Sequence, residues 1–167
     1  DLFADVWGRN AEGVPVPSEL MRSLVHAGGL VSVATAPANG GLIGAAVLGR
    51  AQPGACYSFI AAAIPGAGDR GVGFALKQHQ RAWALGEGLS LMTWTFDPLV
   101  SRNARFNLTK LGARVRAYEP AFYGRMSDSL NGADVADRMV VSWQLDAPVV
   151  GRASAGMPEE PAEPQPA

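Results

Sequence analysis

The sequence predicts one domain of the α/β (α+β) class, with a mixed sheet, an antiparallel first half and flanking helices. Three observations predict this fold class. First, three extended runs, residues 30–36, 42–50 and 55–64, are joined by short links rich in glycine and proline, which is typical of an antiparallel meander. Second, a glycine-rich loop at residues 65–75 leads into a helical pattern. Third, strand and helix patterns alternate after it, and 167 residues suit a single domain.

Two helices are expected before the sheet. Residues 1–8 have the pattern of the end of a helix. Residues 18–27 form a second helix that begins at Ser18, a good N-cap residue, and ends at Gly28 and Gly29. The prolines between the two patterns separate the helices.

The helix after the glycine loop is expected to end at Gly88. Apolar residues at helical spacing define its packed face, and polar residues define its outer face. The packed face is expected to carry Val72, Ala75, Leu76, His79 and Trp83, and the outer face Lys77, Gln78 and Arg81.

A further helix is expected between two later strands. Asp97 and Pro98 favour a helix start, because Asp caps well and Pro suits the first helical position. This helix should reach Leu111 and end at Gly112. The later extended runs are residues 91–96, 114–118 and 139–145.

The composition disfavours several classes of protein. Lys and Arg number 14 against 15 Asp and Glu, so the net charge of −1 gives no chain-wide basic surface for nucleic acid. No stretch approaches the roughly 18 consecutive apolar residues of a membrane helix. The single cysteine, Cys56, cannot form an intramolecular disulfide, and the two histidines lack metal-ligand spacing. We expect a soluble, reduced, cytoplasmic protein with no metal, no nucleic acid and no membrane partner.

The composition changes at residue 147. Residues 147–167 hold no aromatic side chain, five of the twelve prolines and three glutamates. Such a segment lacks the apolar area needed to offset its ordering entropy. The sequence therefore predicts a folded domain at residues 1–146 and a disordered, dispensable tail at residues 147–167. Ten of the fourteen basic residues lie between Arg70 and Arg138, so the second half of the domain could hold an anion.

The glycine loop, PGAGDRGVGFA at residues 65–75, has two interpretations. First-turn helix amides favour phosphate, and glycines allow a close approach to them. Residues 66–71 also match the G-x-G-x-x-G pattern, so an NAD-binding domain is an alternative. However, the acid expected about 20 residues on would have to be Asp97, 31 residues after Gly66. No Lys-Ser or Lys-Thr pair supports an ATP or GTP loop.

Four segments carry a more specific signal: residues 70–77 (RGVGFALK), 93–99 (TWTFDPL), 107–113 (NLTKLGA) and 137–138 (DR). With the order of elements, they resemble an uncharacterised bacterial subgroup of the GNAT superfamily of acyl-CoA N-acyltransferases. The resemblance covers most of residues 2–145. It implies a GNAT-like mixed sheet whose two central strands splay apart. The first strand of that fold is missing, which is expected of a trimmed start.

The resemblance implies acetyl-CoA or another acyl-CoA as co-substrate. In GNAT proteins the motif Arg/Gln-x-x-Gly-x-Gly/Ala holds the pyrophosphate; it corresponds to residues 68–73, with Gly68 in place of Arg. The pantetheine arm is expected between residues 55–64 and 91–96. The implied binding residues are Ala61, Ala62, Ala63, Ile64, Asp69, Arg70, Gly71, Val72, Gly73, Phe74, Asn103 and Asn107. Capping or solvent exposure would equally explain the two asparagines.

The implied chemistry is direct attack of an amine on the thioester carbonyl, which needs a base, an amide for the oxyanion and an acid. Many GNAT enzymes use a Tyr as the acid, but Leu108 stands at that position. The candidates for these roles are Tyr118 and Tyr123 as acids, Ser58 and Tyr57 as a relay through water, Asp97 as a base, and the amide of Ala62 or Ala63. Packing is the alternative for the two acids, and helix capping for Asp97.

The predicted function is transfer of an acetyl or other short acyl group to a primary amine of a small-molecule acceptor in a ternary complex, with amino-acid-like molecules among the candidate acceptors. Arg114, Arg116 and Arg138 would suit an acidic substrate, or would be solvated charge at strand edges. A noncatalytic acyl-CoA binding or regulatory module is the alternative, favoured by Leu108 and Gly68. Homodimers are common in the fold, which makes a homodimer an expectation by analogy.

Overall fold

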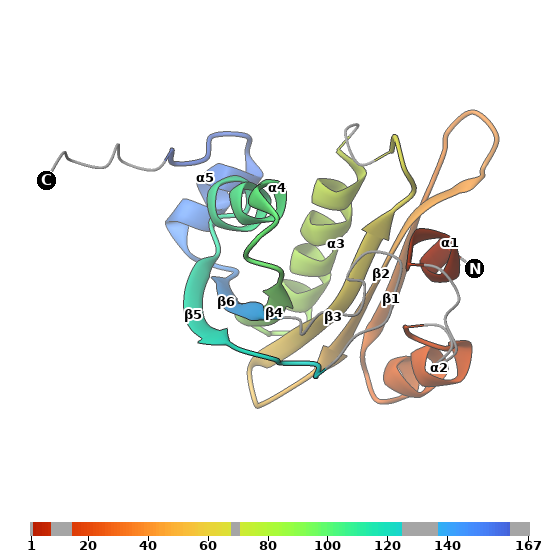
Figure 1. The fold of residues 1–167 in the computed structure, drawn as a ribbon, viewed down its shortest axis with the longest axis horizontal. Helices are drawn as coiled ribbons and strands as arrows, with labels where there is room; N and C mark the ends of the chain where they lie inside the picture. Colours follow the sequence, from red (N-terminus) through yellow and green to blue (C-terminus); the bar gives the residue numbers. More distant parts are fainter. Residues whose placement is uncertain (1, 8–14, 68–70, 125–136, 161–167) are drawn as a thin grey trace, which may run out of the picture.

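The computed structural model describes residues 2–7, 15–67, 71–124 and 137–160. Its centre is a six-stranded mixed sheet in the order β1-β2-β3-β4-β6-β5 (Figure 1). The strands are β1 (Leu30–Thr35), β2 (Leu42–Arg50), β3 (Ala55–Ala63), β4 (Leu91–Phe96), β5 (Arg114–Glu119) and β6 (Arg138–Gln144). The helices are α1 (Leu2–Trp7), α2 (Ser18–His26), α3 (Val72–Gly86), α4 (Ser101–Ala104), a π-helix (Arg105–Lys110) and α5 (Pro148–Ser154). The mixed sheet with flanking helices confirms the predicted fold class.

The first half of the sheet is an antiparallel meander, as predicted. β1 pairs with β2, and β2 pairs with β3, both antiparallel. The link between β1 and β2 is tight, because the Ala36 N–H donates to the Gly41 carbonyl (2.7 Å) and the Gly40 N–H to the Ala36 carbonyl (2.8 Å). Dinucleotide-binding domains instead begin with parallel strands joined by crossover helices. The topology therefore excludes the NAD-binding alternative.

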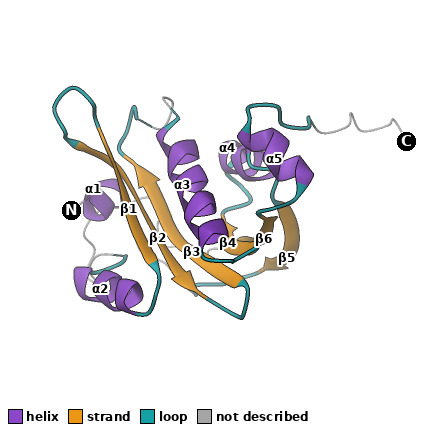
Figure 2. Cartoon of the chain, turned by 180° about the vertical axis from the view of Figure 1, so that it is seen from behind, coloured by secondary structure: helices purple, strands orange, loops and turns teal. Residues whose placement is uncertain are grey.

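The sheet divides between β3 and β4. These parallel strands pair over three residues each, and the last pair is Tyr57 with Thr93. Beyond it, β3 continues from Ser58 and β4 from Trp94 without pairing to each other. We call this divergence the fork. Figure 2 shows the two groups of strands on either side of α3. The splayed central strands expected from the resemblance are confirmed.

The two faces of the first half are covered by different helices. Residues on a strand alternate between faces, so neighbouring residues of β2 meet different partners. Ala45 packs in a cluster with Phe3 of α1, and Ala46 packs in a cluster with Leu76 of α3. α1 and α3 thus lie on opposite faces of β2, and the first turns of α3 are fixed against the sheet.

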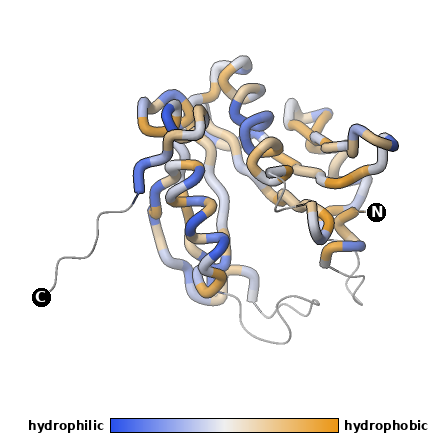
Figure 3. Tube along the Cα trace, turned by 90° about the horizontal axis from the view of Figure 1, so that it is seen from above, coloured by the Kyte–Doolittle hydropathy of each residue, from blue (hydrophilic) through white to orange (hydrophobic). Residues whose placement is uncertain are grey.

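The larger core cluster lies in the second half of the domain. Trp94 of β4 and Trp143 of β6 meet edge to face, with ring centres 5.9 Å apart. The indole N–H of Trp143 donates to the Leu111 carbonyl at 2.7 Å, so this buried donor is satisfied. Figure 3 shows that the helices carry hydrophilic stretches between hydrophobic ones.

The face that α3 turns to the sheet agrees with the prediction only in part. Its buried residues are Val72, Leu76, Lys77, Gln80 and Ala84, of which Val72 and Leu76 were predicted. Ala75 and His79 are exposed, so their predicted places on the packed face are wrong, and so is the outward position of Lys77. The physical reason is that Lys77 and Gln80 both hydrogen-bond with Ser58 of β3, which allows polar side chains to occupy packed positions.

The helix predicted to start at Asp97 begins four residues later. Asp97 Oδ1 accepts the N–H of Leu99 at 2.8 Å, which forms a turn rather than a helix cap, and α4 starts at Ser101. After one turn α4 widens into the π-helix, a rare element that is frequent at functional sites. Gly112, with a φ of 71°, follows the helix, consistent with the predicted end.

Residues 148–154 correct the predicted boundary of the folded domain. They form α5, in which Val150 is 1% exposed and Ala153 2% exposed. Val150 belongs to the same core cluster as Leu111 and Leu145. The proline-rich composition was misleading here, because Pro148 occupies the start of the helix, where proline is favoured. Residues 161–167 of the predicted tail lie outside the described residues.

Candidate functional site

The start of α3 presents backbone N–H groups without helical partners. Gly71 is the N-cap, with a φ of 82°, a left-handed conformation that favours glycine. It has no side chain to cap the helix, so the amides of Val72, Gly73 and Phe74 have no intrahelical acceptor. These three amides and the helix dipole favour a phosphate group here. Gly68, Asp69 and Arg70, expected in the same loop, lie outside the described residues.

The unpaired part of β3 forms one side of the fork. Ala61, Ala62 and Ala63 pair with β2 on one edge and have no β4 partner on the other. Their small side chains leave the strand accessible to an extended ligand. The Ile64 N–H donates to the Ile43 carbonyl at 3.0 Å, so this amide is already used by the protein. Because pairs along an antiparallel ladder alternate in their hydrogen bonding, Ala62 turns its N–H toward β2 like Ile64, and the candidate backbone donors for a ligand are those of Ala61 and Ala63.

A buried polar cluster lies where the two strands part. Lys77 is 4% exposed, and its Nζ donates to Ser58 Oγ at 2.8 Å and lies 3.9 Å from the centre of the Trp94 ring. Ser58 Oγ donates to Gln80 Oε1 at 3.1 Å. Burial lowers the pKa of Lys77 to about 7, opposed by the nearby Cys56.

The predicted relay of Ser58 with Tyr57 is not assembled directly, because neighbouring strand residues point to opposite faces. Ser58 instead bonds to Lys77 and Gln80, which the sequence prediction did not include in the site. One signal in the sequence could have revealed them: Lys77, Gln80 and Ala84 recur at helical spacing beside the apolar stripe.

Cys56 lies under the same cluster and is inert. Its thiol donates weakly to the Leu91 carbonyl at 3.5 Å. Burial raises the pKa of Cys56 to about 11, although Lys77 and Arg50 act against the rise. A thiol with so high a pKa is a poor nucleophile near neutral pH.

The hydroxyl groups of Tyr57, Thr95 and Tyr123 gather near the fork, on the face of the sheet opposite to Ser58 and Lys77. Thr95 of β4 and Tyr123 lie in hydrogen-bond contact, with 3.2 Å between their oxygens. Burial, together with the neighbouring Tyr123, raises the pKa of Tyr57 to about 12, so this group stays a phenol. The Tyr123 ring also lies 5.4 Å from the guanidinium of Arg138. Tyr57 and Tyr123 can pass protons as hydroxyls.

Tyr118 and Asp97 are engaged elsewhere. Tyr118 lies on β5, which β6 separates from β4, and its hydroxyl donates to Asp137. That hydrogen bond raises the pKa of Tyr118. The Asp97 carboxylate holds the Leu99 turn and lies 4.0 Å from Arg138, which is itself buried.

The two asparagines support the protein's own structure. Asn107 is 5% exposed, and its Oδ1 accepts the indole N–H of Trp94 at 3.0 Å. Its Nδ2 donates to the carbonyl of Asn103 at 2.9 Å, while Asn103 itself is exposed. Asn107 thus helps to fix the ring that faces Lys77, and contact of either residue with coenzyme A stays a prediction.

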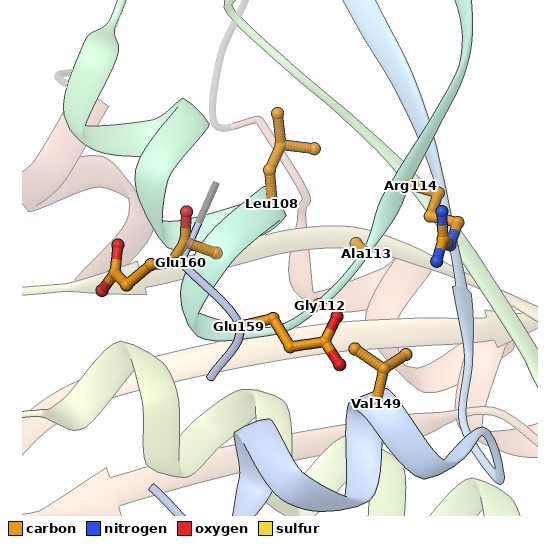
Figure 4. A pocket seen from close by; sticks show the side chains of 8 residues that line it. Leu108, Gly112, Ala113, Arg114, Val149, Glu159 and Glu160 are labelled. Atoms are coloured by element: carbon orange, nitrogen blue, oxygen red, sulfur yellow. The ribbon is translucent and has the colours of Figure 1, made fainter. Parts of the chain in front are cut away.

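A cavity of about 210 Å³ lies away from the fork (Figure 4). It is lined by residues from the π-helix, from β5 and from α5 and the segment after it, and by none from β3 or β4. Leu108, the residue at the usual Tyr position, lines this cavity, and so do the carboxylates of Glu159 and Glu160.

The described residues hold neither a membrane-spanning helix nor a metal-binding cluster. No helix within them is both long and apolar enough to cross a membrane. Over the same part of the chain, no group of three or more His, Cys, Asp or Glu side chains is arranged to hold a metal ion.

Solved structures with a similar architecture include several acetyltransferases. The IAA acetyltransferase from Bacillus cereus superposes with a TM-score of 0.62 and 22% identity, over 77% of this chain and 85% of that one. A GNAT family acetyltransferase from Elizabethkingia anophelis with acetyl-CoA bound superposes with a TM-score of 0.63 and 16% identity, over 77% of this chain and 83% of that one. The ribosomal-protein-S18-alanine N-acetyltransferase from Escherichia coli superposes with a TM-score of 0.57 and 17% identity, over 71% of this chain and 70% of that one. No protein-family model and no curated protein matches the sequence. At these identities the similarity shows the fold, and the fold is that of the GNAT proteins.

Proposed function

Because the chain has the GNAT fold, we propose that it transfers an acetyl or other short acyl group from acyl-CoA to a primary amine of a small acceptor. The observation that supports this most is the position of the fork relative to the start of α3. β3 runs from the last paired residue, Tyr57, to the loop that opens α3. One ligand could therefore place its pyrophosphate on the helix amides and its thioester in the fork.

The dimensions of β3 suit such a ligand. From Tyr57 to Ala63 a strand covers about 20 Å, at roughly 3.3 Å per residue. An extended pantetheine arm can bridge a distance of this size. The backbone edge at residues 61–63 offers it hydrogen bonds along the way, and the alanine side chains leave room. The residues present thus fit acyl-CoA.

The proposed reaction is direct attack in a ternary complex. The amine nitrogen bonds to the thioester carbonyl carbon, and the amide of Ala63, which alternation along β3 turns toward the unpaired edge, donates to the developing oxyanion; the Ala62 amide, expected as the other candidate, turns toward β2. The proton lost by the amine passes to water held by the hydroxyls of Tyr57, Thr95 and Tyr123. Collapse of the intermediate then releases coenzyme A and the amide product.

Ligand binding tests this proposal directly. Acetyl-CoA or succinyl-CoA should raise the melting temperature, because a ligand selective for the native state stabilises it. Free coenzyme A should have a smaller or equal effect, and NADH and ATP should have none. The measurement is a thermal melt of the purified protein with each compound. Absence of any shift with the thioesters, or a shift with NADH alone, would contradict the proposal.

The helix amides can be tested with a charge placed beside them. Gly73→Asp should weaken binding of acetyl-CoA by about tenfold or more, because its carboxylate repels the pyrophosphate and covers the amides. The change should not harm the fold, since acidic residues are favoured in the first helical turn and, among the described residues, a Cβ at Gly73 meets only Phe106, at 4.0 Å.

The matched control is Gly86→Asp at the other end of α3. A Cβ at Gly86 meets no atom of the described part of the chain within 4 Å. An acid there opposes the helix dipole and costs about 0.3–1 kcal/mol of stability, but it lies away from the loop. Its affinity for acetyl-CoA, measured by calorimetry, should be that of the unchanged protein. If the unchanged protein, Gly73→Asp and Gly86→Asp bind acetyl-CoA with equal affinity, the pyrophosphate does not bind at the start of α3.

A noncatalytic acyl-CoA binding module is the second candidate. One observation favours it: Leu108, at the position where many GNAT enzymes have the Tyr acid, lines a cavity away from the fork. Binding of acetyl-CoA without release of coenzyme A over a broad panel of primary amines would support this alternative. Release of coenzyme A with any primary amine would show that the protein is an acyltransferase and not a noncatalytic module.

A further inference from the structure

The buried lysine of α3 occupies the point where β3 and β4 part. Ser58 is the residue after the last paired residue of β3, and Trp94 is the corresponding residue of β4. Lys77 contacts both, at 2.8 Å from Ser58 Oγ and 3.9 Å from the Trp94 ring centre. Its nitrogen therefore lies between the two strands at the apex of the fork.

The hydrogen bonds at this apex have a defined direction. Lys77 Nζ donates to Ser58 Oγ, and Ser58 Oγ donates to Gln80 Oε1. Gln80 Nε2 is buried and has no partner within the described part of the chain. A buried donor without an acceptor is costly, and it is a common mark of a site that receives a ligand atom. The apex thus combines a proton source, a hydroxyl and an unused donor.

We propose that Ser58 protonates the departing coenzyme A thiolate and that Lys77, acting through Ser58, supplies the proton. This inference rests on the function proposed above. As the carbon–sulfur bond breaks, its electron pair goes to sulfur. The Ser58 hydroxyl turns from Gln80 Oε1 and gives its proton to sulfur, and the Lys77 ammonium gives a proton to the Ser58 oxygen. The neutral amine of Lys77 then takes a proton from water, which balances the proton that the acceptor amine released to water.

The other candidate acids are less well placed. Tyr118 lies beyond β6 and donates to Asp137, and Tyr123 contacts Thr95 on the other side of the sheet. Leu108 has no proton to give. Lys77 at the apex is the titratable group that faces the fork from α3.

The surroundings of Lys77 suit an acid that works near neutral pH. The side chains that face it are Cys56 and Ser58 from β3, Trp94 from β4 and Gln80 from its own helix. Cys56 stays a thiol, because burial raises its pKa to about 11, and the other three carry no charge. Burial alone then lowers the pKa of Lys77 to about 7, which is close to the value at which a general acid is most effective.

The first test replaces the two lysines of the chain in parallel. Lys77→Met keeps the length of the side chain and removes the proton source, so kcat should fall by about 10²- to 10⁴-fold, the usual contribution of a general acid. The acetyl-CoA melting shift should persist. Lys110→Met, at an exposed position of the π-helix, should keep the kcat of the unchanged protein. The rate of coenzyme A release, with the primary amine of the panel that reacts fastest, gives kcat for the unchanged protein, Lys77→Met and Lys110→Met.

The second readout is the dependence on pH, which a purely structural role would not change. The ratio of the kcat of the unchanged protein to that of Lys77→Met should be large at pH 6 and should fall as the pH rises to 9, since Lys77 loses its proton over this range. Ionisation of the acceptor cancels in the ratio. A ratio that stays constant, or an unchanged kcat in Lys77→Met, would overturn the inference.

Ser58→Ala tests the hydroxyl itself and serves also if Lys77→Met does not fold. It should lower kcat while leaving acetyl-CoA binding intact, and a kcat equal to that of the unchanged protein would overturn the inference. When the inference alone fails, the unchanged protein still binds acetyl-CoA and transfers its acyl group to an amine. If the unchanged protein does neither, the proposed function fails, and the inference fails with it.

Discussion

A chain that ends at Ala147 should lose about 3–5 kcal/mol of unfolding free energy. α5 buries Val150 and Ala153 almost completely, and full burial of one branched aliphatic side chain is worth roughly 1.5–3 kcal/mol. Removing α5 also exposes the apolar surface that it covers in the cluster of Leu111 and Leu145. Chemical denaturation of the truncated chain, followed by circular dichroism, measures the loss.

The control for this truncation is a chain that ends at Met157. It keeps α5 but loses two ion pairs, Arg152 with Glu159 and Arg105 with Glu160, whose side chains are about half or more exposed. Exposed pairs contribute roughly 0–1 kcal/mol, so this chain should unfold close to the full-length midpoint. The same midpoint for all three chains would show that α5 adds nothing to the fold.

Lys77→Met should stabilise the protein, and the gain should shrink as the pH rises. The pKa of Lys77 falls from its usual 10.5 to about 7 in the folded state. Between these values the unfolded chain binds the extra proton, so the stability of the unchanged protein rises with pH through this window. The penalty for the buried ammonium is therefore complete below about pH 7. The variant lacks the group, so its advantage should shrink by about 2–3 kcal/mol from pH 6 to pH 9.

Unfolding free energies of both proteins at several pH values measure this change. Lys110→Met is again the control, because Lys110 is exposed on the π-helix and its removal takes no charge out of the buried cluster. An advantage of Lys77→Met that is equal at pH 6 and pH 9 would mean that the folded protein does not disfavour the charged lysine.

Much of the fold could be predicted from the sequence, because its signals are local. The strands at residues 42–50 and 91–96 appear at the predicted bounds, since their apolar content and flanking turns leave little choice. The start of α5 could not be predicted from composition. Its two buried residues stand in a stretch rich in proline, and only the core beside them makes that helix stable.

The candidate site was less predictable, because it depends on contacts between distant elements. The loop and the alanines of β3 could be identified by their resemblance to a family. Lys77 could not, since a lysine on a helix is normally solvated, and its burial depends on Ser58, 19 residues away. The turn at Asp97 is a different case, because an Asp before a helix can either cap it or hold a turn two residues on, and both are local.

The pairing of β3 with β4 has a mechanical consequence. The two halves of the sheet are joined by only three residue pairs, whereas the antiparallel neighbours on each side are paired along most of their length. Backbone pairing is therefore a short seam between two plates of the sheet, and side chains supply the rest of the joint. α3 lies across the seam, with Lys77 in contact with both Ser58 and Trp94, so a single helix braces the opening that the two strands leave.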